Sequence, residues 1–175
     1  MSIDWQCILK DYQILVAGLV GFGGVILTMI TNATIQKNQH QRKVLHEVRS
    51  LKAALKAELQ INKQIYEQRV SQLSEHNRAE NHALLPAKTF DAVYQSLVER
   101  IGLLSLEQIG KVIGTYLLIA ELPYKLRILV GTDNVQGFNG EFIRANADLR
   151  QPIAELHRGI INRINEAIKA LDGHA

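Results

Sequence analysis

The 175-residue sequence is poor in several residue types that define whole classes of protein. It contains one cysteine, Cys7, three prolines and only 6% aromatic residues. A single cysteine excludes an intrachain disulfide scaffold and a multi-cysteine metal site. The few prolines and 12 glycines exclude a collagenous or low-complexity chain, and the 47% hydrophobic content excludes a wholly disordered one. The length suits one modest domain with accessory segments.

Charge is absent from residues 12–35, a stretch of 24 residues. Ten Ile, Leu, Val or Phe side chains lie between Ile14 and Ile30. A membrane-spanning helix needs about 20 predominantly apolar residues, and each central aliphatic or Phe side chain contributes roughly −0.3 to −0.6 kcal/mol to insertion. The sequence therefore predicts a transmembrane helix over 12–35.

A cleaved signal peptide is the alternative interpretation of this stretch, because Thr31-Asn32-Ala33 loosely imitates a cleavage site. A signal peptide has a basic leading region and an apolar core of about 7 to 15 residues. Here residues 1–11 contain Asp4, Lys10 and Asp11, and the apolar core is longer. These features favour a retained anchor.

Basic residues are concentrated after the uncharged stretch. Lys10 alone precedes it, and the residues that follow it are Lys37, Arg42, Lys43, Arg49 and Lys52. Because Lys and Arg near a span resist translocation, we expect residues 1–11 outside and the rest in the cytoplasm, at a bacterial inner membrane. Residues 53–175 hold 14 basic and 14 acidic residues, so the net charge of +3 arises next to the span. It suits anionic lipid headgroups, and nucleic-acid binding is not expected.

Small residues form a stripe within the predicted span, since Ala17, Gly21, Gly24 and Thr28 share one helical face. Such a stripe lets two membrane helices approach closely, which predicts a homo-oligomer or docking on another membrane protein. Glycine is also simply common in membrane helices. The sequence leaves both interpretations open.

Residues 36–82 have the pattern of a long helical stalk. Apolar or pattern-matching residues recur with an eleven-residue repeat from Val44 to Leu73, which is typical of a nearly straight helix or bundle. No Pro or Gly occurs between Lys37 and Ala79. The stalk can extend from the membrane or fold back into a bundle. Asn62 lies on the apolar stripe and is expected at a solvent-accessible edge, although such residues can set register.

Residues 83–175 predict a small helical bundle. We expect a helix from about Pro86–Thr89 to Gly102, and a second that begins with a Ser105–Gln108 capping box and is kinked or ended by Pro123. Gly110 and Gly114 would let a neighbouring helix cross closely. A loop over 131–140 and a last helix from near Pro152 to Gly173 complete the chain. No strand-like alternation rises above the helical period, so the predicted fold is all-α, with segments 1–11, 12–35, 36–82 and 83–175.

The sequence offers no convincing catalytic or metal-binding constellation. His76, Glu80 and His82 come closest to a metal cluster, but their spacing differs from the paired histidines of zinc enzymes. The glycine-rich loop 131–140 lacks the Gly-Lys-Ser/Thr that binds phosphate, and Asp133-Asn134 begins a calcium loop that Val135 interrupts. Cys7 is expected to be a free thiol and His157 a surface or interface residue. We therefore expect no cofactor, no metal and no catalysis.

Two functions fit these observations. The first is a single-pass membrane-anchored helical interaction protein or accessory subunit, bound to the lipid bilayer and to another copy or another membrane protein. The alternative is a membrane effector, such as a toxin, holin-like or antiphage protein, that oligomerises and permeabilises the membrane. An uncharged span lines a pore poorly, which ranks the effector second.

Overall fold

The computed structural model describes residues 13–74, 82–131 and 141–173, apart from the side chains at positions 13–16, 19 and 82. The order of elements is α2, β1, α3, η1, α4, β2, η2 and α5. The chain divides into two compact units, Met1–Glu47 and Val48–Ala175. The fold is predominantly helical, as predicted.

Helix α2, Gln13–Ser74, includes residues 13–35 of the predicted span and residues 36–74 of the predicted stalk. Among the described residues, no helix is both long enough and apolar enough to cross a membrane. The transmembrane part of the fold prediction is therefore not supported by the structure. From Val20 onward α2 intersperses its apolar residues with three glycines, three threonines and Asn32, which lower its mean hydropathy. The predicted span 12–35 also includes Tyr12 and the side chains at 13–16 and 19, which lie outside the description.

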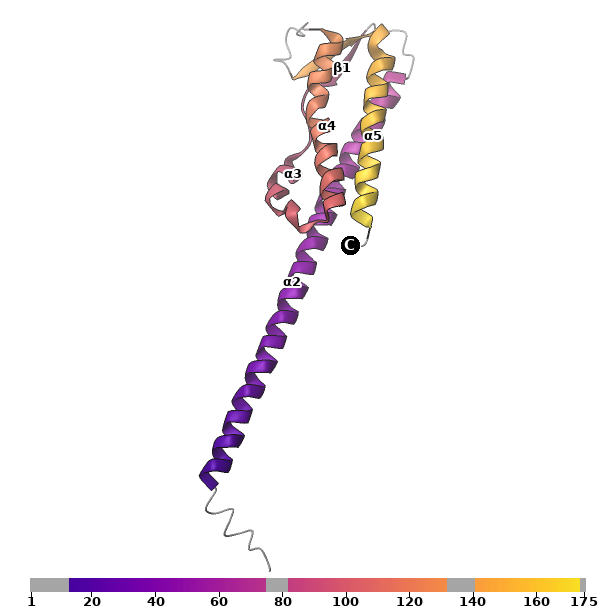
Figure 1. Cartoon of the computed structure of the whole chain (residues 1–175). Coiled ribbons are helices and arrows are strands. Elements are labelled where there is room, and N and C mark those ends of the chain that lie inside the picture. The colour runs from indigo at the N-terminus through magenta and orange to yellow at the C-terminus, as the bar shows by residue number, and fades with distance from the viewer. Residues whose placement is uncertain (1–12, 75–81, 132–140, 174–175) are drawn as a thin grey trace, which may run out of the picture. The chain divides into compact units, whose positions relative to one another are not determined.

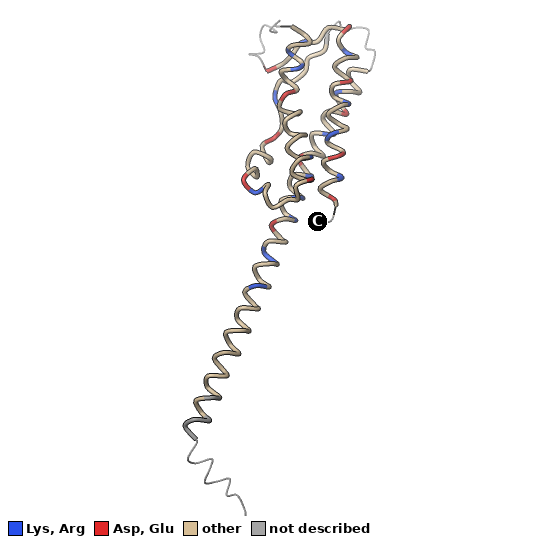
Figure 2. The backbone as a smooth tube through the Cα atoms, in the orientation of Figure 1, with Lys and Arg blue, Asp and Glu red and all other residues tan. Residues whose placement is uncertain are grey.

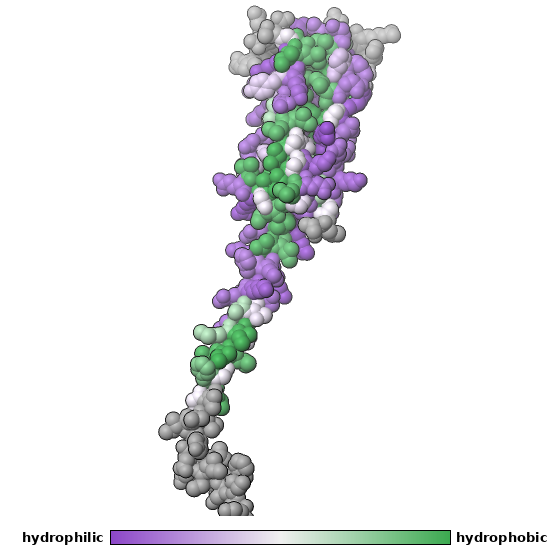
Figure 3. Space-filling view, in the orientation of Figure 1, coloured by the Kyte–Doolittle hydropathy of each residue, from purple (hydrophilic) through white to green (hydrophobic). Residues whose placement is uncertain are grey.

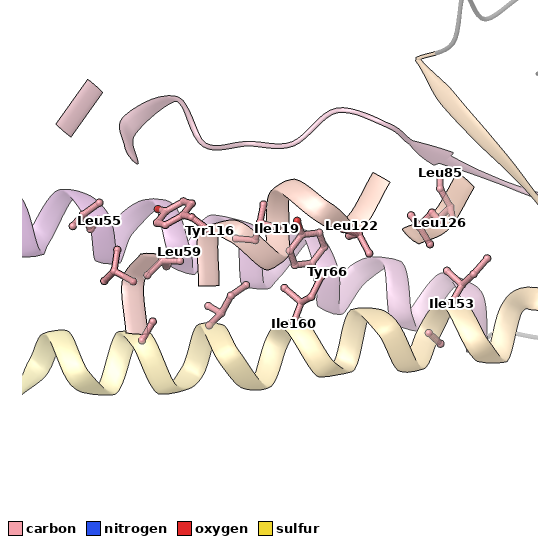
Figure 4. Close-up of a cluster of buried hydrophobic side chains, with 14 of the residues drawn as sticks. Leu55, Leu59, Tyr66, Leu85, Tyr116, Ile119, Leu122, Leu126, Ile153 and Ile160 are labelled. Carbon is pink, nitrogen blue, oxygen red and sulfur yellow. The ribbon is translucent and has the colours of Figure 1, made fainter. Parts of the chain in front are cut away.

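The second unit is a three-helix bundle. Residues 48–74 of α2 pack with α4, Leu106–Val130, and α5, Arg150–Asp172 (Figure 1). Figure 4 shows the core between them, to which α2, α4, α5 and β1 contribute the labelled buried side chains Leu55, Leu59, Tyr66, Leu85, Tyr116, Ile119, Leu122, Leu126, Ile153 and Ile160. Of the two arrangements predicted for the stalk, residues 48–74 thus adopt the one inside the bundle.

Two short strands are present, although the sequence analysis predicted none. β1, His82–Pro86, pairs antiparallel with β2, Phe142–Asn146, with Leu84 opposite Arg144. Ile143 and Ala145 of β2 are buried while Arg144 and Asn146 are exposed. This alternation lasts only five residues, and the partner strands lie far apart in the sequence, so the pattern is too short to distinguish from a helix by periodicity.

Helix α4 begins as predicted, and of the two effects predicted for Pro123, a kink or an end, the structure excludes the end. The Ser105 hydroxyl accepts a hydrogen bond from the Gln108 backbone N–H, and the Gln108 side chain accepts one from the Ser105 N–H, so the capping box is confirmed. Pro123 does not end the helix, which continues to Val130. Leu122 and Leu126 are buried on either side of Pro123, and their packing outweighs the one backbone hydrogen bond that proline removes.

The helix predicted before Gly102 is shorter than expected. It consists of α3, Ala92–Leu97, and the 3₁₀ helix η1, Val98–Leu103. Phe90 and Val93 are exposed, whereas Tyr94, Leu97 and Ile101 are half-buried. The last helix matches its prediction: after the 3₁₀ turn η2, Ala147–Leu149, α5 has Pro152 in its first turn and Gly173 as its C-cap.

Candidate functional site

Helix α4 carries apolar side chains on two opposite faces. The face that meets the core holds its buried residues, which are Gln108, Val112, Thr115, Tyr116, Ile119, Leu122 and Leu126. The opposite face carries four large apolar residues that are 89, 58, 68 and 83% exposed, namely Leu106, Leu117, Tyr124 and Ile128. We call these four residues the outer stripe. Figure 3 shows hydrophobic surface running along the part of the bundle where α4 lies.

The outer stripe is unusual for a helix at a protein surface. A surface helix normally confines its apolar residues to the face that meets the core, while a helix that is apolar all round is buried. Single exposed apolar residues are ordinary, whereas a continuous apolar strip marks an interaction site. The outer stripe therefore is the strongest candidate functional site among the described residues.

A groove between α4 and α5 adjoins the outer stripe. Three successive hollows of about 400, 230 and 410 Å³ follow it, with Lys111 and Glu166 shared by the first two and Leu118 and Arg163 by the last two. Gly110 and Gly114 line the middle hollow, and a Cβ added at either position would meet nothing within 4 Å. Within the described part of the single chain, no helix crosses closely at either glycine. Their missing side chains leave open space at the surface.

Charged residues border the groove. The Lys111 Nζ donates a 2.6 Å hydrogen bond to the Glu166 Oε2, which also accepts a 3.2 Å bond from Arg163. The Lys111 hydrogen bond and charge, followed by Arg163, hold the pKa of Glu166 below its ordinary value. On α4 itself, Lys125 pairs with Glu121 at 2.8 Å. All these side chains are solvent-exposed, so their pairs fix geometry more than stability.

A buried carboxylate ties α2 to α3 and α4. Glu58 Oε1 accepts a 2.7 Å hydrogen bond from the Val93 backbone N–H, and Oε2 accepts bonds from the Tyr94 N–H and the Tyr116 hydroxyl at 2.9 and 2.7 Å. Glu58 thus satisfies two of the free N–H groups at the start of α3, where the Asp91 N-cap makes no side-chain cap of its own. The sequence analysis assigned no role to Glu58. A charged residue at a core position of the stalk helix is the signal that it overlooked.

Asn62 reinforces this tie one turn further along α2. Its Nδ2 donates to the Glu58 and Phe90 carbonyl oxygens at 3.2 and 2.7 Å, and the residue is fully buried. The expectation of a solvent-accessible edge at Asn62 is therefore wrong. Residues 90–94 lie at the start of the short helix α3. Hydrogen bonds to Glu58 and Asn62 attach them to α2.

The tyrosines of this region are structural. The Tyr94 and Tyr116 rings stack with centroids 4.0 Å apart. Burial, then the hydrogen bond to Glu58, raises the pKa of Tyr116 well above its ordinary value. Both effects favour the protonated hydroxyl that donates to Glu58, so Tyr116 acts as a hydrogen-bond donor and not as an acid or base.

His157 lies in the core of the bundle. The prediction of a surface or interface residue at this position is therefore wrong for the surface. Its side chain is fully buried on α5, its Nδ1 lies 2.8 Å from the Ile153 carbonyl oxygen, and its ring meets Tyr66 edge to face at 5.5 Å. Since a carbonyl oxygen only accepts, Nδ1 carries the proton. Desolvation lowers the pKa of His157, whereas the Ile153 hydrogen bond opposes that shift.

Arg69 is a second buried basic residue in this region. Its guanidinium carbon lies 5.4 Å from the centroid of the Tyr66 ring, which gives a cation–π contact. Burial lowers the pKa of Arg69 and raises that of Tyr66 to about 12. Arg69 is buried, whereas the neighbouring Val70 is half-buried.

The predicted helix-packing residues lie on the first part of α2. A Cβ at Gly21 or Gly24 would meet nothing within 4 Å, and Ala17 is exposed. The Thr28 hydroxyl donates to the Gly24 carbonyl oxygen at 2.8 Å, and Thr31 and Thr34 bond in the same way to Leu27 and Ile30. Whether this stripe packs against another helix stays a prediction.

The predicted juxtamembrane basic residues divide between the two units. Lys37, Arg42 and Lys43 lie in the first unit and are exposed. Arg49 and Lys52 belong to the second, where the Lys52 Nζ donates to the Gly173 carbonyl oxygen at 3.2 Å. Lys56 on the next turn pairs with Asp172 at 2.6 Å. Lys52 thus interacts with the end of α5 inside the bundle unit.

The described residues contain no group of three or more His, Cys, Asp or Glu side chains placed to hold a metal ion. Cys7, His76, Glu80, the His82 side chain and the loop residues 132–140 lie outside the described residues. Comparison of the chain with known protein families, with curated proteins and with solved structures finds no match.

Proposed function

We propose that this protein is a membrane-anchored helical interaction protein without catalytic activity. Residues 12–35 hold it in a bilayer, and the bundle binds a protein partner through the outer stripe of α4, as an accessory subunit of a membrane complex. The outer stripe is the observation that carries the proposal, because a helix that is apolar on both faces gains stability by covering the second one.

The first part of α2 supports the anchoring half of the proposal. Its side chains of Val20, Phe22, Leu27, Met29 and Ile30 are exposed on a helix that carries no charge between Gln13 and Gln36, as Figure 2 shows. The hydroxyls of Thr28, Thr31 and Thr34 are already bonded to backbone carbonyl oxygens. Internal bonds of this kind lower the cost of placing a polar group in lipid.

Alkaline extraction of membranes tests the anchor. In the double variant Phe22→Lys, Val25→Lys, each lysine costs roughly 2.5–3.5 kcal/mol of insertion free energy at the centre of a span. We expect the wild type in the pellet and this variant in the soluble fraction. Leu45→Lys is the matched control, because Leu45 is also exposed on α2 but lies outside the predicted span. Extraction of the wild type by alkali would contradict the anchor.

Affinity capture of the full chain in mild detergent tests the interaction half. We expect a stoichiometric protein partner, either a second copy or another protein, that Leu117→Glu removes and that Arg158→Glu on the outward face of α5 does not. A partner retained by Leu117→Glu would contradict a role for the outer stripe. Depolarisation of cells on expression would instead favour the membrane effector.

A further inference from the structure

We propose that the occupant of the outer stripe is a second copy of this chain, docked through α4 in antiparallel orientation with Leu117 beside the two-fold axis. This inference rests on the proposed function and names the partner. Its failure is distinguishable, because a foreign protein bound at the outer stripe would remove the homodimer and leave the proposed function standing.

On the outer face of α4, the two ends of the outer stripe lie at equal distances from Leu117, and Tyr124 mirrors a glycine. Leu106 lies eleven residues before Leu117 and Ile128 eleven after, and Gly110 and Tyr124 lie seven before and seven after. Eleven residues make almost a whole number of helical turns, so the outer stripe runs nearly straight along α4. In a two-fold interface the same surface meets itself, so that if residue i contacts residue j then j contacts i. An antiparallel pair therefore sets Leu106 against the second copy's Ile128.

The open space at Gly110 fits the Tyr124 ring. A Cβ at Gly110 would meet nothing within 4 Å, and Tyr124 of the same helix is 68% exposed. In the antiparallel register each Tyr124 lies over the other copy's Gly110. A large residue set against a small one gives the interdigitated packing that well-formed helix interfaces share with protein interiors.

Charge complementarity selects the antiparallel orientation. At about 100° per residue, Glu107, Lys111, Glu121 and Lys125 fall on one side of the outer stripe, within about 80° of the circumference of the helix. Glu107 and Lys125 lie ten residues before and eight after Leu117, and Lys111 and Glu121 lie six before and four after it, so each pair is within two residues, about 3 Å, of mirrored heights. In an antiparallel pair, residues on one side of the stripe meet the same side of the other copy at mirrored heights. Both pairs then join opposite charges.

A parallel pair lacks this complementarity. In a parallel pair, the charged flank of one outer stripe would face the opposite flank of the second copy's outer stripe. On that opposite flank Arg127 is the one charged residue of α4. Complementary charges across an interface set orientation and register more than raw affinity. The charge pattern of α4 therefore specifies the antiparallel arrangement.

Disulfide cross-linking of the full chain tests the orientation. In a Cys7→Ser background, Gly110→Cys chains are mixed with Tyr124→Cys chains and oxidised. The antiparallel dimer predicts a mixed 110–124 disulfide, with little cross-linking of either variant to itself. Self-linked 110–110 and 124–124 products would reveal a parallel pair and overturn the proposal, as would the absence of any cross-link at α4.

Charge reversal tests the register. Glu107→Lys or Lys125→Glu alone places like charges together twice in the dimer, and we expect its dissociation constant to rise about five- to thirtyfold. The double variant Glu107→Lys, Lys125→Glu should restore dimerisation. Additive weakening in the double variant would overturn the proposal. Gly21→Ile, Gly24→Ile is the control, because it addresses association through α2 and should leave the α4 cross-links unchanged.

Discussion

Helices α4 and α5 lie side by side in the bundle, yet they differ in what they turn outward. α5 buries Ile153, Ile160 and Ile164 and carries charged residues on its other face, among them Glu155 and Arg158, which pair at 2.6 Å. α4 buries an equally apolar face but turns four large apolar residues outward. α5 is thus complete in a single chain, whereas α4 is suited to a surface that another chain covers. This difference is the reason that we propose α4 as the interaction surface.

Truncation of a side chain on the inward face of α4 should lower the stability of the fold, whereas truncation on the outward face should weaken association. Ile119→Ala removes a fully buried side chain and should lower the free energy of unfolding by about 2–5 kcal/mol. Leu117→Ala should change the unfolding of the single chain by within about 0.5 kcal/mol, because Leu117 is exposed, but should weaken association. Denaturant unfolding at a protein concentration where the chain is monomeric distinguishes the two. Equal losses would mean that Leu117 packs inside its own bundle.

Removal of the Glu58 carboxylate, which bonds α2 to α3 and α4, should also lower the free energy of unfolding substantially. Glu58→Ala leaves the Tyr116 hydroxyl and two backbone N–H groups without their acceptor, and we expect a loss of about 2–3 kcal/mol of unfolding free energy. Glu67→Ala is the matched control, since Glu67 is exposed on the same helix and pairs only with Lys63 at 3.7 Å. Its loss should stay below about 0.5 kcal/mol. A similar loss in both variants would show that Glu58 carries no special role.

The inward face of α5 predicts a pH dependence. Burial lowers the pKa of His157, so near pH 6.5 and below the unfolded chain binds a proton that the folded chain does not. The contribution of His157 to stability is full above pH 6.5 and falls as the pH drops, until the pH passes below the folded pKa. His157→Gln should lose this component of the pH dependence between pH 8 and 5, whereas His46→Gln on the exposed surface should keep it. Parallel pH profiles for wild type and His157→Gln would contradict the burial.

The smallest effect is expected at the groove between α4 and α5. Lys111→Ala removes the ion pair with Glu166, which is exposed and screened by solvent, and should leave the stability of the fold nearly unchanged. It should also raise the pKa of Glu166, because Lys111 is the main cause of its lowered value. NMR titration of the Glu166 carboxyl measures this change. An unchanged pKa would show that the pair does not form in solution.

The helices were predictable where their signals are local. Ser105 and Gln108 lie three residues apart and announce the start of α4, and Pro152 and Gly173 delimit α5 in the same way. The strands were not predictable, because Leu85 and Ile143 meet only through the folded chain and each strand has five residues. Pro123 shows the same limit, since burial of Leu122 and Leu126 overrides a local signal.

The candidate site was less predictable than the fold. Residues 112–120 are uncharged, which favours a buried helix, but nothing in a single sequence says which face of that helix meets its own bundle. Leu117 lies within this stretch and is nevertheless exposed. The buried hydrogen bonds of Glu58 and Asn62 were not predicted, because they depend on contacts between distant parts of the chain. Their partners at Val93, Tyr94 and Phe90 lie about 30 residues away and are joined to them only by tertiary structure.

The oligomeric mass of the full chain in mild detergent, compared between wild type and Leu117→Glu, is the decisive measurement for an interface at α4. We expect a wild-type complex and a folded Leu117→Glu chain that runs as a monomer, with Gly21→Ile, Gly24→Ile unchanged in its α4-dependent association. A wild type that is monomeric without a partner, or a complex that Leu117→Glu leaves intact, would contradict an interface at the outer stripe of α4.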